Sequence, residues 1–181
     1  MDSGKISTRY AKAIYRFAVS CGEESRLAGE MKVLTSQFEK LPELKKALEN
    51  PTVSNEEKHI LLLTASGGDV SDTCRRALQL VVGNGRAGYM PSVALMYDKV
   101  YRREKRILRV DLTTVEPASR EIEQSLIGLI TDRAIEKVDF DARSDGGIIG
   151  GFVLQIEDRR LDASVRSQLN QIRLKLLGKG V

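Results

Sequence analysis

The sequence holds few of the residue types on which catalysis and metal binding usually depend. Its 181 residues include one histidine, two cysteines and no tryptophan. Histidine triads, multi-histidine metal sites and Cys/His zinc clusters all need more of these side chains than the chain has. Cys21 and Cys74 lie too far apart in the sequence to form a CxxC pair, and we expect both to be free thiols, buried on helix faces in a reducing cytosol. The sequence therefore predicts no catalytic residues, no bound metal and no cofactor.

Long apolar runs are also missing. No stretch approaches the roughly 18 consecutive apolar residues that a membrane-spanning helix needs. We therefore expect no membrane span, signal peptide or transit segment, so that the protein would reach a membrane only through its partners. Hydrophobic residues make up 41% and charged residues 30% of the chain, with four prolines. This composition is typical of a globular protein with one domain or two small ones.

The charge balance is only slightly basic, with 29 Lys and Arg against 25 Asp and Glu. The main cluster of cations lies at the predicted end of the sixth helix, where solvated cations are common. The cluster also permits a second interpretation, in which the protein is a basic helical nucleic-acid-binding module. That interpretation predicts an affinity that falls steeply with salt. The cluster consists of Lys99, Arg102, Arg103, Lys105, Arg106 and Arg109, with Tyr97 and Tyr101 close by. A second basic row, which could rim a groove for a partner helix, consists of Lys5, Arg9, Lys12 and Arg16.

The first hundred residues repeat one pattern, apolar side chains at spacings of three and four residues, interrupted by residues that stop helices. Gly22 follows the first apolar stripe as a helix cap, and Ser54 with Glu57 forms an S-x-x-E capping box. The pattern predicts a bundle of six helices, over about residues 6–21, 27–41, 42–49, 54–66, 74–82 and 88–105. The first stripe consists of Ile6, Tyr10, Ala13, Ile14, Phe17, Ala18 and Cys21.

From Ile107 onward the apolar period changes to two, which is the pattern of a half-buried strand. A helix is predicted next, then two strands near residues 138–140 and 152–156, and a last helix over residues 165–177. The chain should therefore fold as a predominantly helical α+β protein. Its domains would be residues 1–105, a six-helix bundle, and residues 106–181, a small β-α-β-β-α module. The first helix of that module would carry Ile122, Leu126, Leu129 and Ile130.

Gly83, Gly85 and Gly88 spell the G-x-G-x-x-G pattern of dinucleotide-binding folds. In those folds the glycines follow a strand within a βαβ unit. Here the preceding residues, 75–82, have the pattern of a helix, so a helix cap followed by a turn is the better interpretation. Paired carboxylates such as Asp139 and Asp141 have no nucleophile nearby, which leaves an enzyme as a distant third possibility.

Several segments, in order along the chain, resemble one protein family. They are Arg9–Ala18 (RYAKAIYRFA), Asn50–Val53 (NPTV) followed by Glu57 and Lys58, Val82–Arg86 (VGNGR), Ile148–Val153 (IIGGFV) and Asp162–Arg166 (DASVR). The chain resembles the delta subunits of bacterial ATP synthases, which are relatives of the mitochondrial oligomycin-sensitivity-conferring protein. The resemblance covers essentially the whole chain. The family fold, a helical bundle followed by a small α+β part, has the same order as the elements predicted above.

The resemblance implies a non-catalytic stator subunit of a proton-transporting ATP synthase, which couples proton translocation to ATP synthesis by linking the catalytic head to the peripheral stalk. Its helical domain would bind N-terminal segments of alpha subunits in a groove between the first and fifth helices, at Tyr10, Ile14, Phe17, Ala77, Leu78 and Val81. Its C-terminal part would meet the b subunits of the stalk through the last helix, at Val165, Leu169, Ile172 and Leu176. The expected state is a monomer within a hetero-oligomer that binds no nucleic acid. The expected location is the cytoplasmic side of the bacterial inner membrane.

Overall fold

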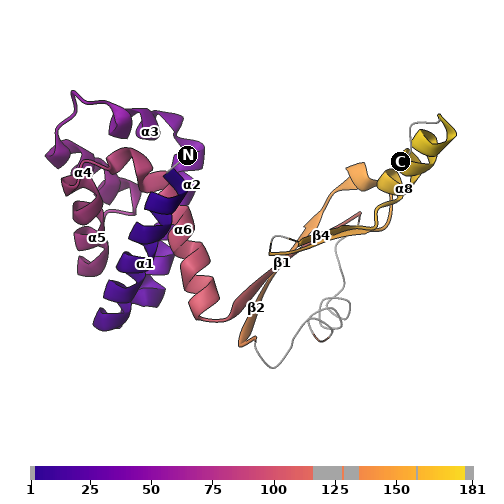
Figure 1. The fold of residues 1–181 in the computed structure, drawn as a ribbon, viewed down its shortest axis with the longest axis horizontal. Helices are drawn as coiled ribbons and strands as arrows, with labels where there is room; N and C mark the ends of the chain where they lie inside the picture. Colours follow the sequence, from indigo (N-terminus) through magenta and orange to yellow (C-terminus); the bar gives the residue numbers. More distant parts are fainter. Residues whose placement is uncertain (1–2, 116–127, 129–134, 158, 178–181) are drawn as a thin grey trace. The chain divides into compact units, whose positions relative to one another are not determined.

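A computed structural model describes residues 3–115, 128, 135–157 and 159–177. The chain divides into two compact units, Met1–Glu104 and Lys105–Val181 (Figure 1). The sequence placed this boundary after residue 105. The first unit is helical and the second contains a small four-stranded sheet, which confirms a predominantly helical protein of mixed α and β structure.

Two helix ends of the helical unit lie at the capping residues that the sequence predicts, Gly22 and Ser54. Gly22 ends the first helix with a positive φ of 70°, which glycine adopts without steric cost. The hydroxyl of Ser54 accepts a hydrogen bond from the Glu57 backbone N–H, and the Glu57 carboxylate accepts one from the Ser54 backbone N–H, so the predicted capping box is confirmed. The elements are α1 (Ser3–Cys21), α2 (Glu24–Lys40), α3 (Pro42–Glu49), α4 (Asn55–Ala65), α5 (Asp72–Gly83), the 3-10 helix η1 (Ala87–Tyr89) and α6 (Met90–Glu104).

Helix α6 lies against both α1 and α2 and supplies much of the core of this unit. Tyr97 is its largest fully buried side chain, and its hydroxyl donates a hydrogen bond to the carbonyl oxygen of Glu24, 3.2 Å away. A buried hydroxyl needs such a partner because its desolvation would otherwise be uncompensated. The same core contains buried side chains from other helices, among them Leu27, Met31, Leu34, Cys74, Leu78 and Val81.

The buried side of α1 differs from the predicted stripe. The residues that are buried are Ser7, Ala11, Ile14 and Ala18, whereas Tyr10 and Phe17 are only partly buried and Ala13 is exposed. Three of these four buried side chains are small, and small side chains let neighbouring helices approach closely. The sequence pattern favoured the larger apolar residues, which form a second row beside the buried one. The prediction about the cysteines was half wrong, because Cys74 is buried but Cys21, at the end of α1, is exposed.

The described elements of the second unit are β1 (Ile107–Thr114), β2 (Lys137–Ser144), the 3-10 helix η2 (Gly146–Ile148), β3 (Phe152–Ile156), β4 (Arg159–Asp162) and α8 (Val165–Leu176). The strand order is β2-β1-β3-β4. β1 pairs with β2 in parallel and with β3 antiparallel, with Val110 opposite Phe140 and Ile156. The predicted helix with Ile122, Leu126, Leu129 and Ile130 lies outside the described residues. Val110, Leu112 and Leu154 are the buried centre of this unit.

Strand β4 was not predicted from the sequence. Its four residues, Arg-Arg-Leu-Asp, are all exposed, and it lies at the edge of the sheet beside β3. Charged side chains are common on edge strands because they discourage pairing with other chains. Such a strand lacks the alternating apolar pattern by which strands are predicted.

Candidate functional site

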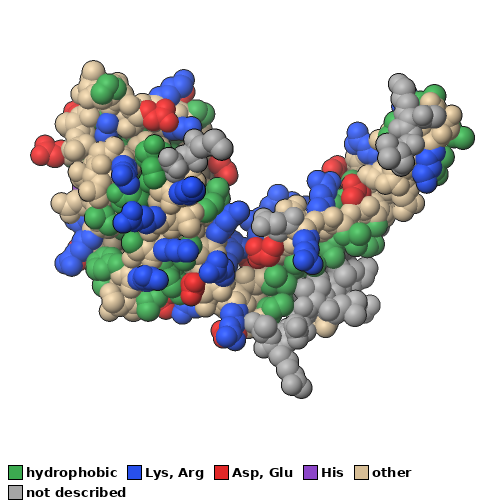
Figure 2. Space-filling model, viewed as in Figure 1, with side chains coloured by type: hydrophobic (Ala, Val, Ile, Leu, Met, Phe, Trp, Pro, Cys, Tyr) green, Lys and Arg blue, Asp and Glu red, His purple; other side chains and the backbone are tan. Residues whose placement is uncertain are grey.

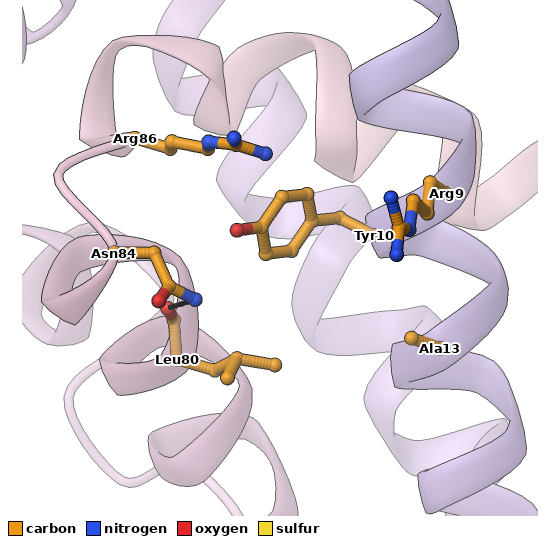
Figure 3. Close-up of a pocket in the computed structure, with 6 residues that line it drawn as sticks. All are labelled: Arg9, Tyr10, Ala13, Leu80, Asn84 and Arg86. Carbon is orange, nitrogen blue, oxygen red and sulfur yellow. Dashed lines mark hydrogen bonds between the residues drawn. The ribbon is translucent and has the colours of Figure 1, made fainter.

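A hollow of about 350 Å³ lies between α1 and the end of α5 (Figure 3). We call it the α1–α5 hollow. Leu80 comes from α5, and Asn84 and Arg86 come from the segment that follows α5. Arg9, Tyr10 and Ala13 come from α1. The two walls are thus formed by segments about 70 residues apart in the sequence, which the bundle brings together.

The turn after α5 positions one of the two cations of the hollow. Asn84 ends the helix with its side-chain amide donating to the carbonyl oxygen of Leu80 at 2.8 Å. Gly85 follows with a φ of 67°, a conformation that glycine adopts readily. This confirms the helix cap and turn predicted for the glycine motif. The turn places the Arg86 guanidinium over the ring of Tyr10, 5.5 Å from the ring centroid, within the range of a cation–π interaction.

The α1–α5 hollow therefore combines apolar and basic side chains. The ring of Tyr10 and the side chains of Ala13 and Leu80 supply the apolar surface, with Arg9 and Arg86 beside them. Leu80 is 48% exposed. This combination suits the apolar face of a partner helix, with acidic side chains at its edges.

Five of the six predicted groove residues do not line this surface. Ile14, Ala77, Leu78 and Val81 are buried in the core of the bundle. Tyr10 does line the α1–α5 hollow, whereas Phe17 is partly buried and is not among the lining residues. Apolar residues at spacings of three and four indicate a buried face whether that face meets its own bundle or a partner. The sequence pattern could not separate the two cases. The assignment of the groove itself stays a prediction.

Leu80, Asn84 and Arg86 were not predicted as groove residues. A signal for Leu80 was present, because it is apolar yet lies off the stripe of buried residues on α5. Arg86 belongs to the VGNGR segment that carried the family resemblance. Its position over Tyr10 depends on the turn at Gly85, so the helical pattern by itself could not place it.

The predicted basic row on α1 is exposed. Lys5, Arg9, Lys12 and Arg16 all lie at the surface of the helical unit. Figure 2 shows Lys and Arg side chains gathered over α1, with hydrophobic side chains between them. The row passes the α1–α5 hollow, since Arg9 belongs to both. An acidic partner segment would therefore find cations along the helix as well as at the hollow.

The last helix presents a second candidate surface. No side chain of α8 is buried, and the four residues predicted there, Val165, Leu169, Ile172 and Leu176, are all exposed. The helix begins at Ser164, whose hydroxyl accepts a hydrogen bond from the Ser167 backbone N–H. Asp162 accepts hydrogen bonds from the backbone N–H and hydroxyl of Ser164 and from the hydroxyl of Ser167. These bonds lower the pKa of Asp162 below its usual value, because they favour the carboxylate form.

Residues 6–176 match the family model of the ATP synthase delta (OSCP) subunit. The chain belongs to this family. A delta subunit relative, "ATP synthase subunit delta" of Azobacteroides pseudotrichonymphae, is 42% identical over 97% of this chain and 100% of its own length. The protein of the same name from Parabacteroides distasonis is 39% identical over 98% of each chain. A chain of the mitochondrial ATP synthase hexamer of Toxoplasma gondii has a similar fold, with a TM-score of 0.68 and 22% identity over 94% of this chain and 97% of that chain.

Family membership decides between the interpretations that the sequence left open. The ATP synthase delta (OSCP) subunit is a structural, non-catalytic part of the ATP synthase complex, so the chain is not an enzyme. The nucleic-acid-binding interpretation has no comparable support. In the structure two cations of its basic cluster pair with carboxylates, Arg102 with Asp98 and Arg109 with Asp111. Among the described residues, no helix is both long and apolar enough to cross a membrane.

Proposed function

We propose that the two units of this protein divide the work of a stator subunit between them. Membership of the ATP synthase delta (OSCP) subunit family makes the chain a non-catalytic stator subunit that links the catalytic head to the peripheral stalk. The helical unit binds N-terminal segments of alpha subunits, and the C-terminal unit binds the b subunits of the stalk. The observation that carries this proposal is the α1–α5 hollow, an open apolar surface that is also lined by Arg9 and Arg86.

The α1–α5 hollow fits an amphipathic helix. Apolar side chains of the segment lie against Tyr10, Ala13 and Leu80, which removes their exposed apolar surface from water. Arg9 and Arg86 orient the segment through its acidic side chains, because complementary charges fix the register and direction of binding more than they raise affinity. The exposed apolar residues of α8 bind the stalk in the same way, by burying apolar side chains of the b subunits.

A stator must hold while the rotary mechanism works against it. Each charge that crosses about 100 mV delivers roughly 2.3 kcal/mol, and several charges are coupled to each ATP. Two moderate contacts on one chain hold more firmly than either alone, since each keeps the other partner at a high effective concentration. We expect the protein to lie at the cytoplasmic side of the bacterial inner membrane, as a single copy within the complex and attached to the membrane only through it.

Calorimetric titration of the full chain with a peptide from the N-terminus of the cognate alpha subunit tests the head contact. We expect saturable one-to-one binding that survives moderate salt, and no binding to a nucleic-acid control. Leu80→Asp places a charge in the α1–α5 hollow and should weaken binding by at least about tenfold. Val33→Asp, at an exposed apolar residue of α2, is the matched control and should bind as the wild type does. No measurable binding of the peptide, together with salt-sensitive binding of nucleic acid, would contradict the proposal.

A second titration tests the division of labour. Deleting residues 164–181 removes α8 and should abolish binding to the soluble part of the b subunits, while binding of the alpha peptide stays unchanged. Retention of both contacts by the deletion variant would refute the assignment of the stalk to α8.

A further inference from the structure

Ile149 has a backbone conformation that branched residues avoid. Its φ is 68° and its ψ is −38°, and a positive φ at a β-branched residue is an outlier. Its side chain is nevertheless 65% exposed, so burial within the chain does not compensate for the conformation. Strained backbone that persists at a surface points to a functional role for the side chain it displays.

The surroundings of Ile149 hold it in this conformation. The side chain of Ile148 is buried, and the carbonyl oxygen of Gly150 accepts a hydrogen bond from the Val165 backbone N–H at 2.9 Å. A Cβ atom at Gly150 would lie 3.0 Å from Val165 Cγ2, and one at Gly151 would lie 2.3 Å from the carbonyl oxygen of Ala163. The IIGGFV segment thus packs tightly against the start of α8. Ile149 is exposed between Ile148 and Gly150, whose positions these contacts fix.

Ile149 forms one wall of a second hollow, of about 470 Å³, which we call the α8 hollow. Its other lining residues are Arg166, Ser167, Leu169, Asn170 and Arg173 of α8. The charges of this helix have one sign, since Val165–Leu176 contains Arg166, Arg173 and Lys175 and no acidic residue. The surface is therefore apolar and cationic, and it complements a segment with apolar and acidic side chains.

We propose that Ile149 anchors an acidic, amphipathic segment of the peripheral stalk in the α8 hollow. This inference rests on the proposed function, which assigns stalk binding to the C-terminal unit. It adds that a residue outside α8 takes part in the contact and that the bound segment is acidic. Arg166 and Arg173, seven residues apart, lie about 10 Å from each other along the helix. They meet carboxylates of the bound segment, while Ile149 and Leu169 contact its apolar face.

Ile149→Gly separates a binding role from a structural one. Glycine accepts the positive φ, so the full-length variant should unfold at the same temperature as the wild type or at a higher one. Its dissociation constant for the soluble part of the cognate b subunits should rise at least about tenfold, because anchor residues contribute most of the binding energy at such surfaces. Its affinity for the alpha peptide should not change.

Two further variants complete the test. Glu157→Gly relieves the positive φ of 51° at a residue outside the α8 hollow and should leave stalk binding unchanged. Arg173→Glu should weaken stalk binding at low salt, whereas Arg159→Glu, on the edge strand β4, should not. If the wild type binds the b subunits and Ile149→Gly binds them equally well, the inference is overturned while the proposed function stands. If the wild type itself does not bind them, the stalk part of the proposed function fails as well.

Discussion

The carboxylate of Glu30 accepts hydrogen bonds from both the backbone N–H and the hydroxyl of Ser71, at 2.6 and 2.7 Å. Glu30 lies on α2 and Ser71 caps the N-terminus of α5, so this pair fixes the start of the helix that carries Leu80. The Ser71 hydroxyl in turn accepts a hydrogen bond from the Cys74 backbone N–H. A carboxylate at a helix N-terminus is further stabilised by the helix dipole.

Glu30→Ala should lower the free energy of unfolding by about 1–3 kcal/mol, because it leaves buried donors of Ser71 without their acceptor. Urea denaturation of the two proteins measures the difference. Glu39→Ala changes an exposed glutamate on the same helix and should alter stability by less than about 0.5 kcal/mol. Equal effects of the two substitutions would show that the Glu30–Ser71 pair does not stabilise the bundle.

The two cysteines should differ in reactivity. Burial, with the nearby Glu30 carboxylate, raises the pKa of Cys74 to about 12, and thiols react as thiolates. Cys21 is exposed. At pH 8 we expect a thiol reagent to modify only Cys21 rapidly in the folded protein. In urea, which unfolds the protein, both cysteines should react rapidly. Cys21→Ser should remove the rapid phase, and its persistence in that variant would contradict the burial of Cys74.

Asp162 should stabilise the start of α8 in a pH-dependent way. Its pKa is lowered in the folded protein from a usual value of 3.8, so its contribution is present at neutral pH and is lost as the pH falls through the folded-state pKa. Asp162→Asn should therefore unfold more readily than the wild type at pH 7, with a difference that shrinks toward pH 3. Thermal unfolding across this pH range measures the effect, and a difference independent of pH would exclude the carboxylate as its source.

Neighbouring residues of α1 should separate folding from binding. Ile14→Asp puts a charge in the core and should cost more than about 4 kcal/mol of stability, so loss of binding in that variant would reflect loss of the fold. Ala13→Asp, at an exposed position in the α1–α5 hollow, should change stability by less than about 0.5 kcal/mol and weaken binding of the alpha peptide. Circular dichroism and calorimetry measure the two effects. Normal peptide binding by a folded Ala13→Asp variant would argue against the α1–α5 hollow.

Local signals were enough to predict that the first unit is helical and that strands begin near Ile107, although the bounds of several helices differ from the predicted ones. Helix caps such as Gly22 and the Ser54–Glu57 box act over a few residues, so the sequence shows them directly. The period of the apolar pattern reports secondary structure for the same reason. The family segments, spread from Arg9 to Arg166, were likewise visible in the sequence itself, and with them the stator role.

Only the tertiary structure decided which apolar residues are core and which are surface. Ile14 and Ala13 are adjacent in one predicted stripe, yet one is buried and the other lines the α1–α5 hollow. The difference depends on which side of α1 meets α6, and a helical period does not specify its neighbour. The placement of Arg86 over Tyr10 and the outward turn of Ile149 arise in the same way. Both depend on contacts between segments that are distant in the sequence.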